Sequence, residues 1–141
     1  MIVWRCGWLL IVSGLGACAG DGAPSDTLGD CVDDGEFEFT HALQPGSDAL
    51  CPEIDPETLR VSEGRLANDC DPSCDCDTSE AGPPVCQGTI LQTCTDGTQT
   101  TTVDCTFALG QPQSVSGSCE VVLETGVVDL SCGYDISGTR L

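Results

Sequence analysis

The sequence is poor in positive charge and in aromatic side chains. Its 141 residues include 4 basic residues, none of them lysine, against 23 acidic ones. Such a chain lacks the basic surface that a phosphate backbone requires, which excludes nucleic acid as a partner. With 3 Phe, 2 Trp and 1 Tyr, any hydrophobic core is thin and built largely from Val, Leu and Ile. The fold therefore needs stabilisation from something other than a large core.

Motifs for the common catalytic chemistries are also missing. We find no Gly-x-Ser-x-Gly, no Gly-rich phosphate loop, no Cys-x-x-Cys-His and no zincin helix. The single histidine, His41, lies on the apolar face of a predicted strand. We interpret it as a partly buried histidine satisfied by a neighbour rather than as a catalytic base. Any two carboxylates can meet in a cleft for glycoside chemistry, but no pair stands out. We predict no enzymatic activity and no cofactor.

The first 18 residues differ from the rest of the chain in composition. Arg5 precedes a nearly unbroken apolar run from Gly7 to Leu15, which is the layout of an export signal. The run is well short of the roughly 20 residues that a membrane-spanning helix needs. Ala17-Cys18-Ala19 fits an A-x-A secretory cleavage site, so ordinary secretion is one interpretation.

Leu15-Gly16-Ala17-Cys18 also matches a lipobox, an aliphatic residue and two small residues before a cysteine. The segment resembles the lipoprotein signal peptides of Gram-negative bacteria. The resemblance implies that residues 1–17 are removed, that Cys18 is lipidated with palmitate-type chains, and that the chain is anchored in the outer membrane. Residues 18–30, rich in Gly, Asp, Pro and Ser, are expected to form a flexible acidic tether. The 124 residues that follow the predicted signal peptide suit one domain.

Ten cysteines remain after Cys6 and Cys18 are set aside. An even number in a small exported domain predicts five disulfide bridges. A zinc site at Cys70-x-x-x-Cys74-x-Cys76 is disfavoured because no histidine lies nearby. The ten residues are Cys31, Cys51, Cys70, Cys74, Cys76, Cys86, Cys94, Cys105, Cys119 and Cys132.

Alternating apolar and polar residues predict β-strands. Residues 35–43 and 58–62 form two, residues 89–107 form a hairpin turning at Asp96-Gly97, residues 119–132 form a second hairpin, and residues 133–141 form a last strand. No segment has a helical apolar period. We therefore predict an all-β fold over residues 31–141, a small antiparallel sandwich or open barrel of about six strands.

The second hairpin predicts one specific disulfide. A two-residue loop at Thr125-Gly126 places Cys119 opposite Cys132, within the Cα separation that a disulfide bridges. A three-residue loop is rejected because it sets Val121 against Asp129 and mixes the two faces. The other pairings stay open.

Residues 68–85 are predicted to be a stapled loop, since turn-forming residues dominate them. The segment lacks EF-hand spacing, yet its carboxylates are candidates for weak calcium binding. These carboxylates belong to Asp69, Asp71, Asp75, Asp77 and Glu80.

The domain as a whole combines Gly35-x-Phe-x-Phe, a Cys-Pro pair, a Thr-rich cysteine hairpin and a final Cys-Gly-Tyr-x-x-x-Gly-Thr-Arg strand. It resembles a loose class of cysteine-rich bacterial surface lipoproteins, which supplies no activity. We expect a membrane-anchored lipoprotein with a non-enzymatic binding or envelope-structural role and a protein or glycan partner. A small-ligand or calcium-binding module is the second hypothesis, and a periplasmic enzyme or enzyme inhibitor is the third.

Overall fold

The computed structural model describes residues 27–67, 70–110 and 113–141. The predicted signal peptide, the predicted lipidation site Cys18, residues 18–26 of the predicted tether and the calcium candidate Asp69 lie outside these residues. Within the described residues, no helix is long and apolar enough to cross a membrane.

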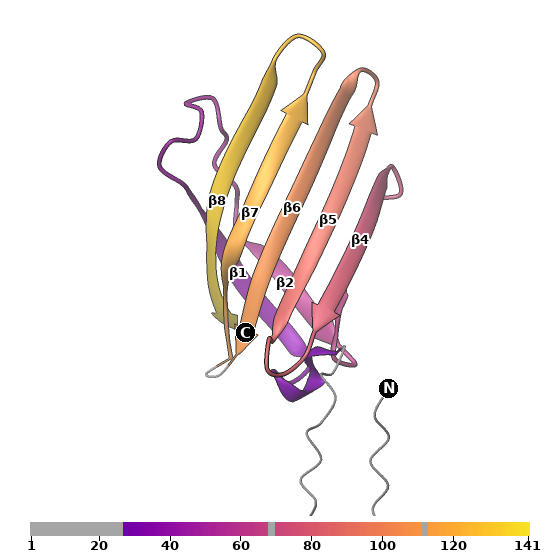
Figure 1. Ribbon diagram of the computed structural model, residues 1–141, viewed down its shortest axis with the longest axis vertical. Helices are drawn as coiled ribbons and strands as arrows, with labels where there is room; N and C mark the ends of the chain where they lie inside the picture. The colour runs from indigo at the N-terminus through magenta and orange to yellow at the C-terminus, as the bar shows by residue number, and fades with distance from the viewer. Residues whose placement is uncertain (1–26, 68–69, 111–112) are drawn as a thin grey trace, which may run out of the picture.

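The protein is all-β, with eight antiparallel strands in one sheet (Figure 1). The order across the sheet is β3-β2-β1-β8-β7-β6-β5-β4, so strands from the two ends of the domain, β1 and β8, are neighbours. A short 3-10 helix, η1 (Leu28–Asp30), precedes the strands. Their bounds are β1 (Gly35–Leu43), β2 (Glu57–Ser62), β3 (Arg65–Ala67), β4 (Cys74–Ala81), β5 (Gln87–Asp96), β6 (Gln99–Gly110), β7 (Ser114–Glu124) and β8 (Asp129–Arg140).

The sheet curls into a nearly closed barrel whose seam lies between the edge strands β3 and β4. Side-chain contacts join the seam, since the described residues show no backbone ladder there. The Glu80 carboxylate accepts a hydrogen bond from the Leu66 N–H at 2.9 Å and lies 3.3 Å from the Arg65 guanidinium. The Glu80 side chain is only 6% exposed. Its contacts with Leu66 and Arg65 stabilise this carboxylate in its buried position at the seam.

The core fills one end of the barrel, where inward-pointing residues alternate with outward-pointing ones. Leu28 of η1 and Val32 close this end and are fully or almost fully buried. Because Leu28 belongs to the core, the predicted tether boundary at residue 30 is too late, and the folded domain includes η1. The buried strand residues include Phe37, Phe39, Leu59, Val61, Leu66, Phe107, Leu109, Val115, Tyr134 and Ile136.

The all-β class and the strand at residues 35–43 are confirmed, but the predicted strand count is too low. Residues 74–81 form a strand, β4, rather than a loop. This strand was missed because its inner positions hold Cys74, Cys76 and Thr78 in place of large apolar residues. Residues 129–140 form one long strand, β8, rather than the end of a hairpin and a separate strand.

The predicted bridge between Cys119 and Cys132 is wrong. The β7–β8 ladder ends at the pair Glu124 and Asp129, so the loop has four residues, 125–128. Within this loop the Thr125 hydroxyl accepts the Val128 N–H at 3.1 Å, which supports the longer loop. Each cysteine therefore lies two residues away from the predicted register, with Cys132 opposite Val121.

All ten cysteines expected to form bridges are paired, as predicted. Cys74–Cys94 and Cys105–Cys119 join residues directly opposite each other on neighbouring strands, with Cα separations of 4.2 and 4.0 Å. The other three, Cys31–Cys86, Cys51–Cys132 and Cys70–Cys76, have Cα separations of 5.5, 5.7 and 6.1 Å.

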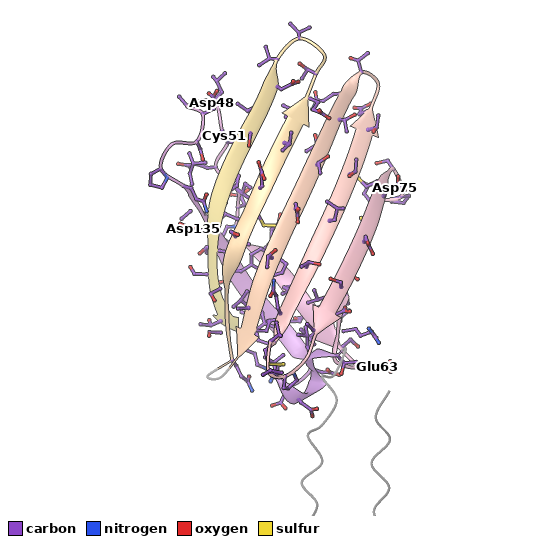
Figure 2. The ribbon with its side chains drawn as sticks, in the orientation of Figure 1. Asp48, Cys51, Glu63, Asp75 and Asp135 are labelled. Carbon is purple, nitrogen blue, oxygen red and sulfur yellow. A yellow bond between two sulfur atoms is a disulfide. The ribbon has the colours of Figure 1, made fainter. Side chains whose placement is uncertain are left out.

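The loop of residues 44–56 is fastened to β8. Cys51 is bonded to Cys132, the Tyr134 hydroxyl donates to the Pro52 carbonyl at 2.7 Å, and the Gln44 amide donates to the Asp135 carboxylate at 2.7 Å. Figure 2 shows Cys51 on this loop beside β8. The loop is thereby held at the open end of the barrel, opposite the end that η1 closes.

Candidate ligand-binding cavity

Unequal strand lengths create an interior cavity. Strands β5 to β8 have 10 to 12 residues, whereas β2 and β3 have 6 and 3. In Figure 1 the long strands continue past the ends of β1 and β2. The inner faces of the long strands therefore lack a facing strand at this end, and their apolar residues Ile90, Val103, Val121 and Leu130 are only partly buried.

The cavity has a volume of about 480 Å³, within the roughly 300–1,000 Å³ typical of small-molecule sites. Phe39, Leu59 and Phe107 are its large buried lining residues. The remaining apolar and sulfur-containing lining comes from the Cys105–Cys119 disulfide, Ile54, Ala67, Ile90, Val103 and Val121. The polar lining comes from His41, Glu57, Thr58 and Gln92.

Strand alternation places His41 in the cavity. It follows Phe37 and Phe39 on the inner face of β1, and its ring lies edge-on to Phe39 and Tyr134 at centroid distances of 5.1 and 6.0 Å. Its Nδ1 atom is buried and has no hydrogen-bond partner among the described residues. The expectation that a neighbour satisfies His41 is therefore wrong for Nδ1. Burial lowers the pKa of His41, against an opposing effect of the Glu57 carboxylate, so the imidazole is neutral at pH 7.

Glu57 is the only acidic residue among the described residues that line the cavity. It lies opposite Phe39 in the β1–β2 ladder and has the same strand phase as the buried Leu59 and Val61. Glu57 is nevertheless exposed, because the β1–β2 ladder ends at the pair of Phe39 and Glu57. Glu57 thus places a carboxylate on an inward-pointing position where the cavity meets solvent.

A second concavity, of about 560 Å³, lies on the outer face of β6 to β8. The loop residues 44–47 border it, and its strand residues are hydrophilic. Asp104 and Glu120 lie directly opposite each other there, and the Ser131 hydroxyl donates to Glu120 at 2.9 Å. This surface has no aromatic side chain for a sugar ring and no enclosed volume, so the interior cavity is the stronger candidate.

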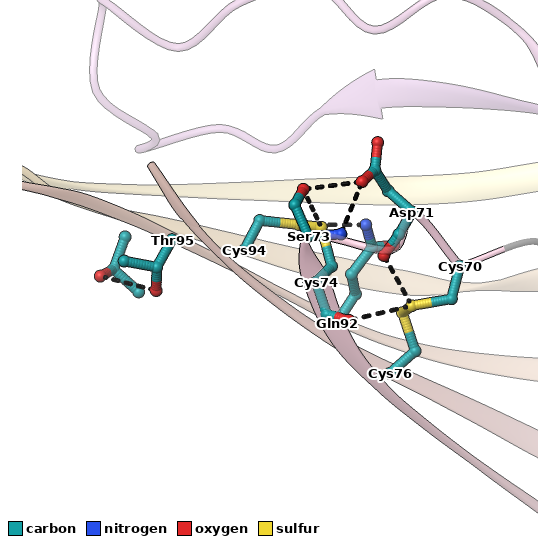
Figure 3. The surroundings of a disulfide bond; sticks show 9 residues. Cys70, Asp71, Ser73, Cys74, Cys76, Gln92, Cys94 and Thr95 are labelled. Carbon is teal, nitrogen blue, oxygen red and sulfur yellow. Dashed lines mark hydrogen bonds between the residues drawn. A yellow bond between two sulfur atoms is a disulfide. The ribbon is translucent and has the colours of Figure 1, made fainter. Parts of the chain in front are cut away.

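The structure does not bring the predicted calcium ligands together. Asp75 and Asp77 lie on the outer face of β4, whereas Glu80 lies at the seam. Asp71 accepts hydrogen bonds from the Ser73 hydroxyl and N–H at 2.7 and 2.8 Å, which lower the pKa of Asp71 (Figure 3). In the part of the chain that the structure describes, no group of three or more His, Cys, Asp or Glu side chains is placed to hold a metal ion.

The sequence analysis disfavoured a zinc site at Cys70, Cys74 and Cys76, and all three of these cysteines are in disulfides. Figure 3 shows the two disulfides, Cys70–Cys76 and Cys74–Cys94, at the start of β4. The Gln92 amide donates to the Cys94 sulfur at 3.2 Å. Gln92 thereby links this disulfide pair to the cavity, which it also lines.

The fold and the cavity define a disulfide-braced, nearly closed β-barrel with one open apolar interior. A scan against protein-family models, a search of the curated proteins and a search of the solved structures found no match for this chain. Sequence reasoning interpreted His41 only as a partly buried histidine, and it missed Glu57 and Gln92. The signal for Glu57 was its position two residues before Leu59, which gives it the inward phase of its strand.

Proposed function

We propose that this protein is a lipid-anchored extracytoplasmic binding module that holds a small apolar ligand inside its barrel and performs no catalysis. The observation that carries the proposal is the apolar cavity of about 480 Å³, whose lining includes Phe39, Leu59 and Phe107. Protein interiors are close-packed, so the side chains that line an empty cavity lack packing contacts. An apolar ligand that fills the cavity supplies these contacts.

The disulfides and the lipobox support the proposed location. Five bridges in one small domain favour an oxidising compartment. Acylation at Cys18 would hold the domain at the outer membrane, with the residues before η1 as a tether. A purely envelope-structural role does not call for an open apolar cavity, which is why binding is the function we favour.

A pair of tryptophan substitutions on β5 tests the cavity. Ile90 lines the cavity, whereas its neighbour Leu91 is 42% exposed on the outer face. We expect a neutral fluorescent probe, N-phenyl-1-naphthylamine, to bind the disulfide-intact protein saturably with one site. Ile90→Trp fills the cavity and should weaken binding at least tenfold, whereas Leu91→Trp should leave it unchanged. Equal affinities of the two variants, or no saturable binding by the wild type, would refute the proposal.

The anchor is tested separately by intact mass. Protein extracted from the envelope should carry acyl chains that are lost in Cys18→Ser, and reduction should add ten hydrogen atoms for the five bridges. An unacylated mature chain of the wild-type protein would remove the anchored part of the proposal and leave secretion in its place.

A further inference from the structure

We infer that the ligand is a cationic amphiphile, with its apolar tail inside the barrel and a protonated amine beside Glu57. This inference rests on the proposed binding function and names the chemical class of its ligand. Three features of the structure lead to it: an acidic group at the cavity opening, the distant placement of every described arginine, and the capacity of that acidic group to accept hydrogen bonds.

The acidic group is Glu57. Its carboxylate forms no salt bridge in the described part of the chain. It lies close enough to His41 to raise the pKa of that ring, although the opposite effect of burial is larger. One wall beside it is apolar, and a low-dielectric wall strengthens the attraction between a carboxylate and a bound cation. An unpaired carboxylate at the opening of an apolar cavity therefore favours a positively charged head group.

The described basic side chains all lie away from this opening. Arg60 points to the outer face of β2, where it is 3.7 Å from Glu36, and Arg65 lies at the seam with Glu80. Arg140 lies at the end of the barrel that η1 closes, where it donates to the Asp34 carbonyl and to the Gln113 side chain. A carboxylate or phosphate head group would meet Glu57 with no compensating cation, which argues against fatty acids and phospholipids.

The acceptor at the cavity opening matches a donor-rich head group. The carboxylate of Glu57 accepts hydrogen bonds only. A primary ammonium carries three N–H groups that can donate to it. A quaternary ammonium carries the same charge without donors, so comparison of the two separates the charge contribution from the hydrogen-bond contribution.

The experiment uses four ligands with the same decyl chain: decylamine, decyltrimethylammonium, decanol and decanoate. Each displaces N-phenyl-1-naphthylamine from the wild-type protein at pH 7.5, below its micelle concentration. We expect decylamine to bind at least tenfold more tightly than decanoate, with decanol between them. Decyltrimethylammonium should bind more weakly than decylamine because it donates no hydrogen bond to Glu57.

Glu57→Gln should remove the preference for decylamine and leave the affinity for decanol unchanged. Glu38→Gln is the matched control, since Glu38 is an exposed residue on the outer face of β1 and its loss changes the net charge equally. Equal affinities for decylamine and decanoate, or equal effects of the two variants, would overturn the inference of a cationic ligand. Saturable binding of the probe would in that case still support the cavity as a binding site. If the probe itself does not bind, the proposed function fails as well.

Discussion

At the scale of single residues, the turn between β2 and β3 has a strained backbone that hydrogen bonds to one side chain stabilise. Glu63 and Gly64 both have positive φ, 55° and 71°, as a two-residue type I′ turn requires. The Asp34 carboxylate accepts the N–H groups of both residues, at 2.6 and 3.0 Å. Glutamate is disfavoured in this conformation because its Cβ crowds the following carbonyl.

Glu63→Asn is therefore expected to stabilise the protein. Asparagine tolerates positive φ better than glutamate does, so we expect a gain of about 0.5–1 kcal/mol in the free energy of unfolding. Urea denaturation with the disulfides intact measures it. Glu53→Asn, at an exposed loop position without positive φ, removes the same charge and should have little effect.

Asp34 makes the stability of this turn depend on pH. The N–H groups of Gly64 and Glu63, followed in effect by the charge of Arg140, lower the pKa of Asp34 below its ordinary value. A carboxylate with a lowered pKa contributes stability above its unfolded pKa, about 3.9, and that contribution is lost as the pH falls through the folded pKa. Asp34→Asn should thus be less stable than wild type at pH 6, with the difference shrinking towards pH 2. A difference that is constant with pH would contradict this role.

At the scale of elements, alternation predicted the faces of strands more reliably than their register. In both predicted hairpins the pairing is displaced by two residues. A two-residue loop at Asp96-Gly97 would set Ile90 opposite Val103, but Ile90 lies opposite Cys105. Cys119 likewise lies opposite Tyr134 rather than Cys132. A shift of two keeps every side chain on its face, so the apolar pattern cannot detect it. The disulfide pairing depends on the register, and the predicted bridge failed for this reason.

Two glycines on adjacent strands allow the barrel to bend around its aromatic core. Gly117 lies opposite Phe107, and Gly138 lies opposite Phe39. A Cβ on Gly117 would collide with the Thr106 carbonyl oxygen, and one on Gly138 would collide with the Glu38 carbonyl oxygen. The two rings pack edge-on at a centroid distance of 5.7 Å. The glycines thus permit close approach of neighbouring strands beside the floor of the cavity.

Gly117→Ala should consequently destabilise the protein by roughly 1–3 kcal/mol, because the added methyl group overpacks against backbone. Thermal and urea unfolding measure this change. Gly110→Ala is the matched control: a Cβ there meets nothing within 4 Å and its φ is not positive. Similar stability of the two variants would show that the strands separate without penalty at Gly117.

At the scale of the whole molecule, disulfides compensate for a small core. The composition predicted this balance correctly, since few aromatics and the ten cysteines of residues 31–141 are visible without a structure. The cavity was less predictable, because it arises from the difference in length between β2 and the long strands β5 to β8. That difference depends on β4 and on the continuous β8, which the apolar pattern did not reveal.

The bridges should differ in their contribution according to the length of chain that they close. Cys51 and Cys132 are 81 residues apart in sequence, whereas Cys70 and Cys76 are 6 apart. In the chain-entropy model, replacing the first pair with alanine costs roughly 4–5 kcal/mol and replacing the second roughly 2–3 kcal/mol. Chemical denaturation of the two double variants, each with four bridges intact, measures the difference.

The same pair of variants separates stability from binding. Cys51–Cys132 fastens the loop that carries Ile54 to the cavity, so its removal should also weaken binding of N-phenyl-1-naphthylamine under conditions where both variants are folded. Cys70 and Cys76 do not line the cavity, and their replacement should leave the affinity close to that of the wild type. Equal loss of affinity in both variants would mean that the bridges act on the cavity only through global stability. A selective loss in Cys51→Ala/Cys132→Ala would mean that the fastened loop itself forms part of the binding site.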